Sequence, residues 1–367
     1  MQLASSIFLF IFFSFSAFAE VTPLEKQLET IRAAYIIPGM SAAIYVDGKA
    51  VEHAVSGIRK VGTAELISQE DKFHLGSCTK SMTATLTAVF VEEGNITWKS
   101  TLEELLPSYQ IHSDLKKITI EKLLAHRSGL TKDPSDELHV KLEKLEPKVG
   151  REELTKIFLA QKPEFKTDEF NYSNIGYILV GHILEALSGK SWETLMQEKI
   201  FMPLAMDTCG FGPTSIEGEE HPSEPWGHIL MDYTVMPVHD DNAPFYGPSA
   251  NVHCSIKDWV KYLTVHMNGF NHESNFLKQE NFDQLHRLAP ISKGEEYTYG
   301  GWYRLQRVWA NGDVLVHTGT NTYNFASVWM APKTKTILVS TANRSRYSGG
   351  WATSEAISAM IRLFINI

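Results

Sequence analysis

The chain has 367 residues, 43% of them hydrophobic, and a formal net charge of -9 at pH 7. This length can bury a large core, in two domains or one big one. The acidic balance, without basic clusters among aromatic residues, argues against a nucleic-acid partner. The three cysteines, Cys78, Cys209 and Cys254, are too few for a disulfide scaffold, so packing must hold the fold. Their redox state stays open.

Residues 1–19 have the features of a secretory signal. The stretch from Ile7 to Phe13 is apolar throughout, and Ala17-Phe18-Ala19 forms a small-x-small cleavage site before Glu20. The apolar run is short for a membrane span, although an uncleaved anchor is the alternative. The sequence therefore predicts export, to the periplasm or the medium, with no stable membrane span after cleavage.

The first predicted elements after this leader are a helix and a hairpin. Residues 23–34 have the pattern of a short amphipathic helix. Residues 41–46 and 49–56 are predicted strands, and Asp47-Gly48 between them is a turn pair that hairpins favour. Residues 57–72 are predicted to be a polar connection.

The stretch from Phe73 to Gly94 is the most informative part of the chain. Between Ser81 and Val91 it has no charge, proline or glycine and carries apolar residues on every face, which predicts a helix buried all round. Lys80 stands at its start, three residues after Ser77, and positions i and i+3 of a helix share a face. A partly desolvated lysine beside a serine is one way to activate a hydroxyl nucleophile.

The same Ser-x-x-Lys spacing occurs again at Ser113–Lys116. That second match lies in a polar stretch with no apolar helix behind it, so we expect it at the surface. The pattern is therefore weak by itself, and the rest of the chain must support a role for Ser77.

The middle of the chain is predicted to be mostly helical. Residues 101–104 form a capping box that opens a short helix, and the charged stretch 131–170 predicts solvated helices and loops. Residues 174–188 are a mostly apolar helix ended by a glycine. Residues 210–249, rich in Gly, Pro, His and aromatics, are predicted long loops of the kind that frame active sites, and 258–266 is helical.

Strands return near the end of the chain, at 299–305, 314–317, 325–330 and 336–341, before an amphipathic helix over 353–365. Strands at both ends with helices between them predict an α+β fold. In it, one antiparallel sheet is flanked by terminal helices and carries an inserted, mostly helical domain. The predicted sheet domain comprises residues 20–76 and 297–367, and the inserted domain with the active-site loops comprises 77–296.

Three short motifs point to the cleft between these domains. They are Gly76-Ser77-Cys78-Thr79-Lys80, then Tyr172-Ser173-Asn174 before an apolar helix, then His317-Thr318-Gly319 at the end of an apolar strand. Each is weak alone, since Tyr-Ser-Asn is also an ordinary helix cap. Their order and structural contexts give them force together.

In this order the motifs resemble those of the serine β-lactamase and penicillin-binding protein superfamily. The relevant branch holds class C β-lactamases, D-alanyl-D-alanine carboxypeptidases and related esterases. The segment 123–130, Leu-Leu-Ala-His-Arg-Ser-Gly-Leu, and the segments 171–181 and 255–263 also resemble family counterparts. The resemblance covers about residues 37–341. It implies a β-lactamase/transpeptidase-like fold and chemistry that requires no metal or other cofactor.

The resemblance also implies roles for individual residues. Ser77 would attack a carbonyl carbon and form an acyl-enzyme, Lys80 would help to remove its proton, and Tyr172 would be the second acid/base. The backbone N–H groups of Ser77 and Thr320 would form an oxyanion hole. The substrate-binding residues implied are Asn174, His317, Thr318, Gly319 and Thr320.

Two positions depart from the class C pattern. His317 replaces a lysine, and an imidazole is mostly neutral above pH ~6.5. The resemblance places His317 opposite the substrate carboxylate, which predicts that KM for carboxylate-bearing substrates rises above that pH. The His-Thr-Gly triplet resembles the carboxypeptidase side of the family. Residues 247–251, Gly-Pro-Ser-Ala-Asn, replace a more usual Pro-Ala-Gly-Gly, which leaves the shape of that loop open.

A metal site is one alternative, because several potential ligands crowd one region: His221, His228, His239, Asp240, Asp241 and His253. They lack helical zinc-ligand spacing. The leading hypothesis is an exported serine hydrolase that acts on peptidoglycan-like D-alanyl peptides and binds penicillin covalently. A class C-like β-lactamase, an esterase or amide hydrolase for a small substrate, and a non-catalytic sensor are alternatives. The complete set of Ser77, Lys80 and Tyr172 argues against the sensor. Oligomeric state stays open.

Overall fold

A computed structural model describes residues 21–290, 294 and 296–365 of the chain. The predicted secretory signal, residues 1–19, lies outside the described residues. Within them, no helix combines the length and the apolar character needed to cross a membrane.

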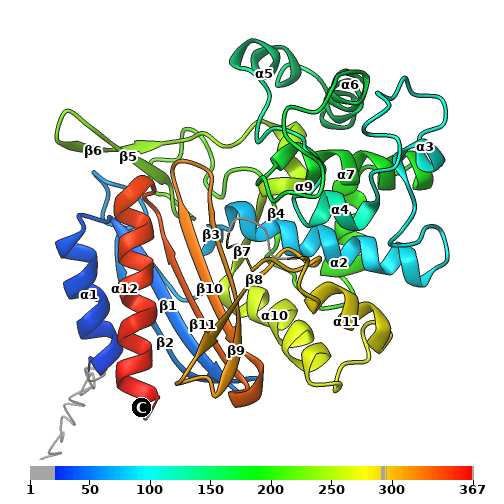
Figure 1. Ribbon diagram of the computed structural model, residues 1–367. Coiled ribbons are helices and arrows are strands. Elements are labelled where there is room, and N and C mark those ends of the chain that lie inside the picture. The colour runs from blue at the N-terminus through cyan, green and yellow to red at the C-terminus, as the bar shows by residue number, and fades with distance from the viewer. Residues whose placement is uncertain (1–20, 291–293, 295, 366–367) are drawn as a thin grey trace, which may run out of the picture.

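The centre of the fold is a six-stranded antiparallel sheet built from both ends of the chain (Figure 1). In spatial order its strands are β2 (Lys49–Gly57), β1 (Gly39–Val46), β11 (Thr336–Ala342), β10 (Phe325–Ala331), β9 (Gly312–Thr320) and β8 (Tyr303–Arg307). Asp47 and Gly48 both have positive φ, +51° and +74°, as the predicted hairpin turn requires. The N-terminal hairpin thus pairs with the C-terminal strands, with Met40 opposite Ala342.

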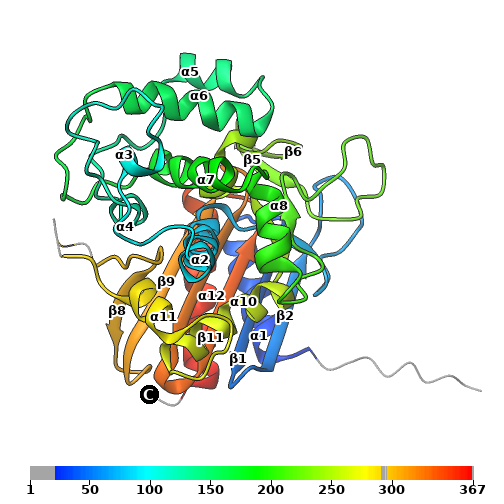
Figure 2. The ribbon, with the colours of Figure 1, turned by 90° about the vertical axis from the view of Figure 1, so that its right-hand side faces the viewer.

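Helices cover both faces of this sheet. Helices α1 (Pro23–Ala34) and α12 (Arg346–Phe364) pack on one face, and the helices between residues 79 and 286 form a helical region on the other (Figures 1 and 2). Side chains alternate accordingly: Ile337 and Val339 join the core of the helical region, whereas Leu338 packs with α1 and α12. The predicted fold class, a sheet flanked by terminal helices with a helical insertion, is confirmed.

Helix α2 (Thr79–Glu92) runs through the middle of the helical region (Figure 2). The other helices there are α3 (Leu102–Leu105), α4 (Ile120–Leu124), α5 (Asp136–Leu142), α6 (Pro147–Ala160), α7 (Asn174–Ser188), α8 (Trp192–Met196), α9 (Gly247–Ala250), α10 (Ile256–Phe270) and α11 (Gln279–His286), with short helical turns at Gln197–Phe201 and Pro244–Tyr246. Side chains on every face of α2 are buried, from Thr79 to Ala88 without a break. This confirms the prediction of a helix buried all round.

Several predicted boundaries are wrong. The stretch 210–249 is not all loop, because it contains a hairpin of β5 (Gly227–Met231) and β6 (Thr234–Val238). A small sheet of β3 (Lys72–His74), β7 (Val252–Ser255) and β4 (Gly210–Phe211) was not predicted, since strands of two to four residues carry no usable periodicity. Helix α12 begins at 346 rather than 353, and β8 begins at 303 rather than 299.

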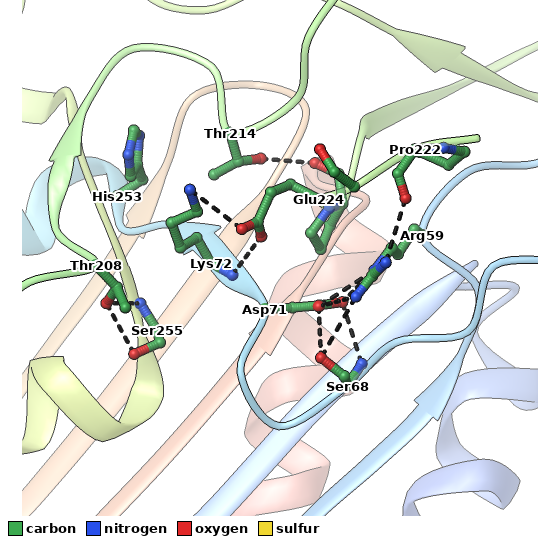
Figure 3. A network of polar contacts seen from close by, with 12 residues as sticks. Arg59, Ser68, Asp71, Lys72, Thr208, Thr214, Pro222, Glu224, His253 and Ser255 are labelled. Atoms are coloured by element: carbon green, nitrogen blue, oxygen red, sulfur yellow. Dashed lines mark hydrogen bonds and ion pairs between the residues drawn. The ribbon is translucent and has the colours of Figure 1, made fainter. Parts of the chain in front are cut away.

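A polar network fastens the loop before β5 to strand β3 (Figure 3). Arg59 makes a two-pronged contact with Asp71 and donates to the Pro222 carbonyl at 3.3 Å. Glu224 accepts the backbone N–H of Lys72 at 2.9 Å and its ammonium at 3.1 Å. Because β3 leads directly into residues 76–78, this network anchors the segment that carries Ser77.

Cys209 and Cys254 form a disulfide, with their Cα atoms 4.2 Å apart, and Cys78 is buried as a free thiol. The bond joins the chain just before β4 to strand β7. It therefore cross-links the segment before β4 to its neighbour β7, within the small sheet that also contains β3.

Removing this disulfide is expected to destabilise the protein without altering its site. For a sequence separation of 45 residues, loop-closure entropy gives a loss of up to about 4 kcal/mol in the free energy of unfolding. Denaturant titrations of the wild type and of Cys209→Ser/Cys254→Ser, each with and without reductant, measure the loss. Reductant should weaken only the wild type. Equal stability of the two proteins in oxidising buffer would contradict the expectation.

Candidate active site

Ser77 lies in a single turn of 3-10 helix, Gly76–Cys78, between β3 and α2. Its side chain is partly exposed, whereas that of Lys80, one turn later in α2, is completely buried. The Lys80 Nζ lies 3.2 Å from the Ser77 Oγ. The predicted Ser-x-x-Lys pair therefore combines an accessible hydroxyl with a desolvated amine.

The amine of Lys80 has two further contacts. Its Nζ donates to the Asn174 Oδ1 at 2.6 Å and to the Ser249 carbonyl at 2.9 Å. Burial lowers the pKa of Lys80 to about 7, so much of the amine is neutral near neutral pH. A neutral amine has two N–H groups and one lone pair. Since the amide oxygen and the carbonyl are pure acceptors, they take the two N–H groups and leave the lone pair for the Ser77 hydroxyl.

Tyr172 contacts the same hydroxyl. Its side chain is hydrogen-bonded to Ser77, and the Lys80 Nζ is 4.8 Å from the centre of its ring. Burial raises the pKa of Tyr172 well above 10, which keeps the phenol protonated. The structure therefore brings together the three residues predicted to be catalytic, with Tyr172 set up as a proton donor.

Asn174, the first residue of α7, connects this group to residues that the sequence did not indicate. Its Nδ2 donates to the Asp133 Oδ1 at 2.6 Å, and the Tyr246 hydroxyl donates to the same oxygen at 3.2 Å. The second N–H of Nδ2 is the one that would donate a hydrogen bond to a substrate carbonyl. Asp133 and Tyr246 lie in stretches predicted to be solvated or loop, without a motif that marks them.

His126 is also missing from the predicted site, although it belongs to the segment 123–130. Its backbone has φ of +59°, its side chain is fully buried, and its Nδ1 accepts the Ser173 N–H at 3.0 Å. The imidazole lies against the Tyr172 ring, with ring centres 4.3 Å apart. His126 therefore positions Tyr172 through both the ring and the backbone that follows it.

Two glycines bring the ends of the chain together at Ser77. A Cβ on Gly319 of β9 would lie 2.6 Å from the Ser77 backbone nitrogen. A Cβ on Gly76, which has φ of +50°, would lie 2.1 Å from the backbone nitrogen of Thr320. The two N–H groups predicted to form an oxyanion hole are thus on segments in direct backbone contact.

His317 differs from its prediction. It is 2% exposed, and its Nδ1 donates to the Thr318 carbonyl at 2.7 Å. Burial lowers the pKa of His317 to about 3, with a smaller contribution from the charge of Lys80. The prediction that this imidazole titrates near pH 6.5 is wrong, because the side chain is buried and burial disfavours the charged ring. His317 is neutral throughout the physiological range.

Accordingly, His317 is expected to add no pH dependence to substrate binding. With a pKa of about 3, the ring is already neutral at pH 5.5 and stays neutral at pH 8. KM for a carboxylate-bearing substrate, measured across that range in the wild type and in His317→Gln, should follow parallel curves. A rise in KM above pH 6.5 that occurs only in the wild type would show that the imidazole does titrate there.

The remaining candidates lie outside this site. Ser113 and Lys116, the second Ser-x-x-Lys match, are both exposed, as predicted. His228 and His253, considered as metal ligands, instead contact the carbonyl oxygens of Asn343 and Gly212. In the part of the chain that the structure describes, no three His, Cys, Asp or Glu side chains gather as a metal-binding set.

Residues 24–354 match the sequence model of the family described as Beta-lactamase. The chain is 25% identical to Penicillin-binding protein 4 of Amycolatopsis lactamdurans over 66% of this chain and 63% of that protein. It spans less than two thirds of the first curated relatives it matches.

Solved structures share the fold. The octameric penicillin-binding protein homologue from Pyrococcus abyssi superposes with a TM-score of 0.77 at 23% identity, over 95% of this chain and 78% of that one. The Beta-Lactamase/D-Alanine Carboxypeptidase from Pseudomonas syringae does so with 0.76 at 17% identity, over 94% and 100%. At these identities the structures speak for the fold, while the match over residues 24–354 speaks for descent. The chain belongs to the Beta-lactamase family of hydrolases.

Proposed function

We propose that the protein is an exported serine hydrolase that works through an acyl-enzyme at Ser77. The observation that carries this proposal is the set of hydrogen-bond partners around the Lys80 amine. Its two N–H groups have fixed acceptors in Asn174 and Ser249, so the lone pair of the neutral amine is directed at the Ser77 hydroxyl. A serine paired with a buried amine in this way has a general base within reach.

These contacts support the following reaction. Lys80 takes the Ser77 proton while the hydroxyl oxygen attacks the substrate carbonyl carbon. The N–H groups of Ser77 and Thr320 stabilise the negative charge that develops on the carbonyl oxygen. Tyr172, a phenol at neutral pH, gives its proton to the leaving nitrogen or oxygen and regains one from Lys80. Water then enters, and the same groups hydrolyse the ester.

The substrate class proposed first is a peptide ending in D-alanyl-D-alanine, with covalent binding of penicillin as a second property. Support comes from the family and from the likeness to Penicillin-binding protein 4. The disulfide between Cys209 and Cys254 supports export, to the periplasm or the medium, because such bonds persist in oxidising compartments.

An esterase or amide hydrolase is the second candidate, and the state of His317 favours it. A lysine at this place would offer a cation to a substrate carboxylate, whereas a buried imidazole with a pKa of about 3 offers none. A class C-like β-lactamase differs from the carboxypeptidase and the esterase in how fast its penicilloyl acyl-enzyme hydrolyses. The rate of that hydrolysis must therefore be measured to distinguish the three candidates.

The experiment is to acylate the protein with benzylpenicillin and follow intact mass over time. A long-lived adduct, together with release of D-alanine from an acyl-D-alanyl-D-alanine peptide, would support the carboxypeptidase. An adduct that disappears within seconds would indicate a β-lactamase. If no adduct forms but phenyl acetate is hydrolysed, the esterase is favoured. If no adduct forms and none of these substrates is hydrolysed, the proposal is overturned.

A further inference from the structure

We propose that a cavity at the start of α12 receives a large apolar or aromatic leaving group of the substrate. The cavity has a volume of about 660 Å³, and Phe325, Tyr347 and Trp351 contribute its aromatic surface. The inference rests on the proposed attack by Ser77 for its chemistry, but on separate residues for its geometry.

The aromatic side chains are placed to be covered by a ligand. Tyr347 and Trp351 are four residues apart on α12, hence on one face, and are 86% and 65% exposed. The opposite face of α12 packs in the core, so packing of the helix does not explain these two residues. Gly350, between them, lets the helix approach Phe325 closely, since a Cβ there would lie 3.3 Å from the ring. Exposed aromatic surface of this kind marks binding sites.

Thr320 connects the cavity to the candidate oxyanion hole. It lines the cavity, and its hydroxyl contacts that of Ser345. Its backbone nitrogen is the atom that a Cβ on Gly76 would touch at 2.1 Å, immediately beside Ser77. A substrate whose carbonyl oxygen bonds to the Thr320 N–H would therefore extend from Ser77 into this cavity.

The position of α12 indicates which part of the substrate enters. Asn174, predicted to hold the acyl part, belongs to the helical region, whereas α12 covers the opposite face of the sheet (Figure 1). With the acyl part bound at Asn174, the group that reaches the cavity is on the leaving side of the carbonyl.

The chemistry of the cavity selects an uncharged group. The described residues that line it carry hydroxyl and aromatic side chains and no charge. The neutral state of His317 nearby on β9 agrees with this. A ring or a branched alkyl group would cover Trp351 and Tyr347, whereas the methyl group of a D-alanine leaving group would leave them in water. The cavity therefore favours the second candidate function, the esterase or amide hydrolase, over the carboxypeptidase.

Two acetate esters with leaving groups of different size test this. Phenyl acetate carries a ring, and 2,2,2-trifluoroethyl acetate carries a small activated alcohol. Trp351→Ala is expected to lower kcat/KM for the phenyl ester roughly three- to tenfold, the amount that one aromatic contact contributes, and to leave the trifluoroethyl ester within about twofold. Trp351→Phe should restore most of the difference. Equal changes for both esters, or none, would overturn the proposal.

The matched control is Tyr233→Ala, which removes a completely exposed aromatic from the β5–β6 turn. It should change neither ester. If Trp351→Ala instead dissociates an oligomer in gel filtration and leaves both kcat/KM values unchanged, the aromatic face is an interface between copies and the proposal fails.

A binding measurement separates this inference from the proposed function. Phenol binding to the Ser77→Ala protein, followed by saturation-transfer NMR, needs no turnover. If the double variant Ser77→Ala/Trp351→Ala loses the phenol signal, the proposed role of the cavity is supported. An unchanged signal in the double variant overturns it. Ester hydrolysis that persists in Ser77→Ala would refute the nucleophile instead.

Discussion

Ser77→Ala is expected to abolish covalent labelling by penicillin and to lower hydrolysis by on the order of 10⁴-fold or more, because no acyl-enzyme can form without the nucleophile. The neighbouring Cys78 cannot substitute for it. That side chain is 1% exposed, and burial raises the pKa of its thiol, which keeps it protonated and unreactive. Intact mass after incubation with benzylpenicillin and initial rates with phenyl acetate measure the two effects.

The chain contains a matched control for this experiment. Ser113 precedes a lysine by the same three residues as Ser77 but is exposed. Ser113→Ala should therefore label and hydrolyse like the wild type. Labelling that survives in Ser77→Ala, or that disappears in Ser113→Ala, would mean that the nucleophile has been assigned to the wrong residue.

Lys80→Met is expected to slow acylation by about 10³-fold, the order that a positioned general base contributes, because the remaining groups around Ser77 lack a basic lone pair near neutral pH. In the wild type, the acylation rate should rise with pH and level off above about 7, since the base is the neutral amine and burial lowers the pKa of Lys80 to about 7. Stopped-flow acylation by a chromogenic β-lactam, across pH 5.5–9, measures both.

Stability distinguishes this loss from misfolding. The pKa of Lys80 is lower in the folded protein than in the unfolded chain, so the unfolded chain binds more protons between the two values, and the cost of burying the ammonium is fully present below pH 7. Lys80→Met removes that cost, and its free energy of unfolding at pH 6 should equal or exceed that of the wild type. Lys116→Met, at the exposed second match, should change neither rate nor stability. A fast Lys80→Met enzyme would exclude the amine as the base.

Local patterns predicted those parts of the fold that local interactions determine. Helix α1 and helix α7 have the predicted boundaries, the second because Gly189 takes a left-handed conformation that ends it. The small sheet of β3, β7 and β4 could not be predicted in this way. Its two- to four-residue strands depend on pairing between segments far apart in the sequence.

The candidate site shows the same division. Short motifs carry Ser77, Lys80, Tyr172 and Asn174, so the sequence alone predicts that these residues belong to one site. The Ser249 carbonyl has no sequence signature, because any residue offers the same backbone acceptor and only the fold determines which one Lys80 meets. For His317, the motif indicates the residue but not the protonation state of its ring. The ring lies among side chains such as Tyr297 and Tyr303, and desolvation by such neighbours is invisible in a strand pattern.

Because Gly76 contacts Gly319, activity is expected only when segments from both ends of the chain have folded together. The proposed nucleophile, Ser77, belongs to a segment near the start, and Thr320, the proposed second oxyanion donor, follows Gly319 near the end. The proposed oxyanion hole is therefore incomplete until β9 has docked onto residues 75–78. A folding intermediate with an intact helical region but an undocked C-terminal hairpin would hold Ser77 and Lys80 and still be inert.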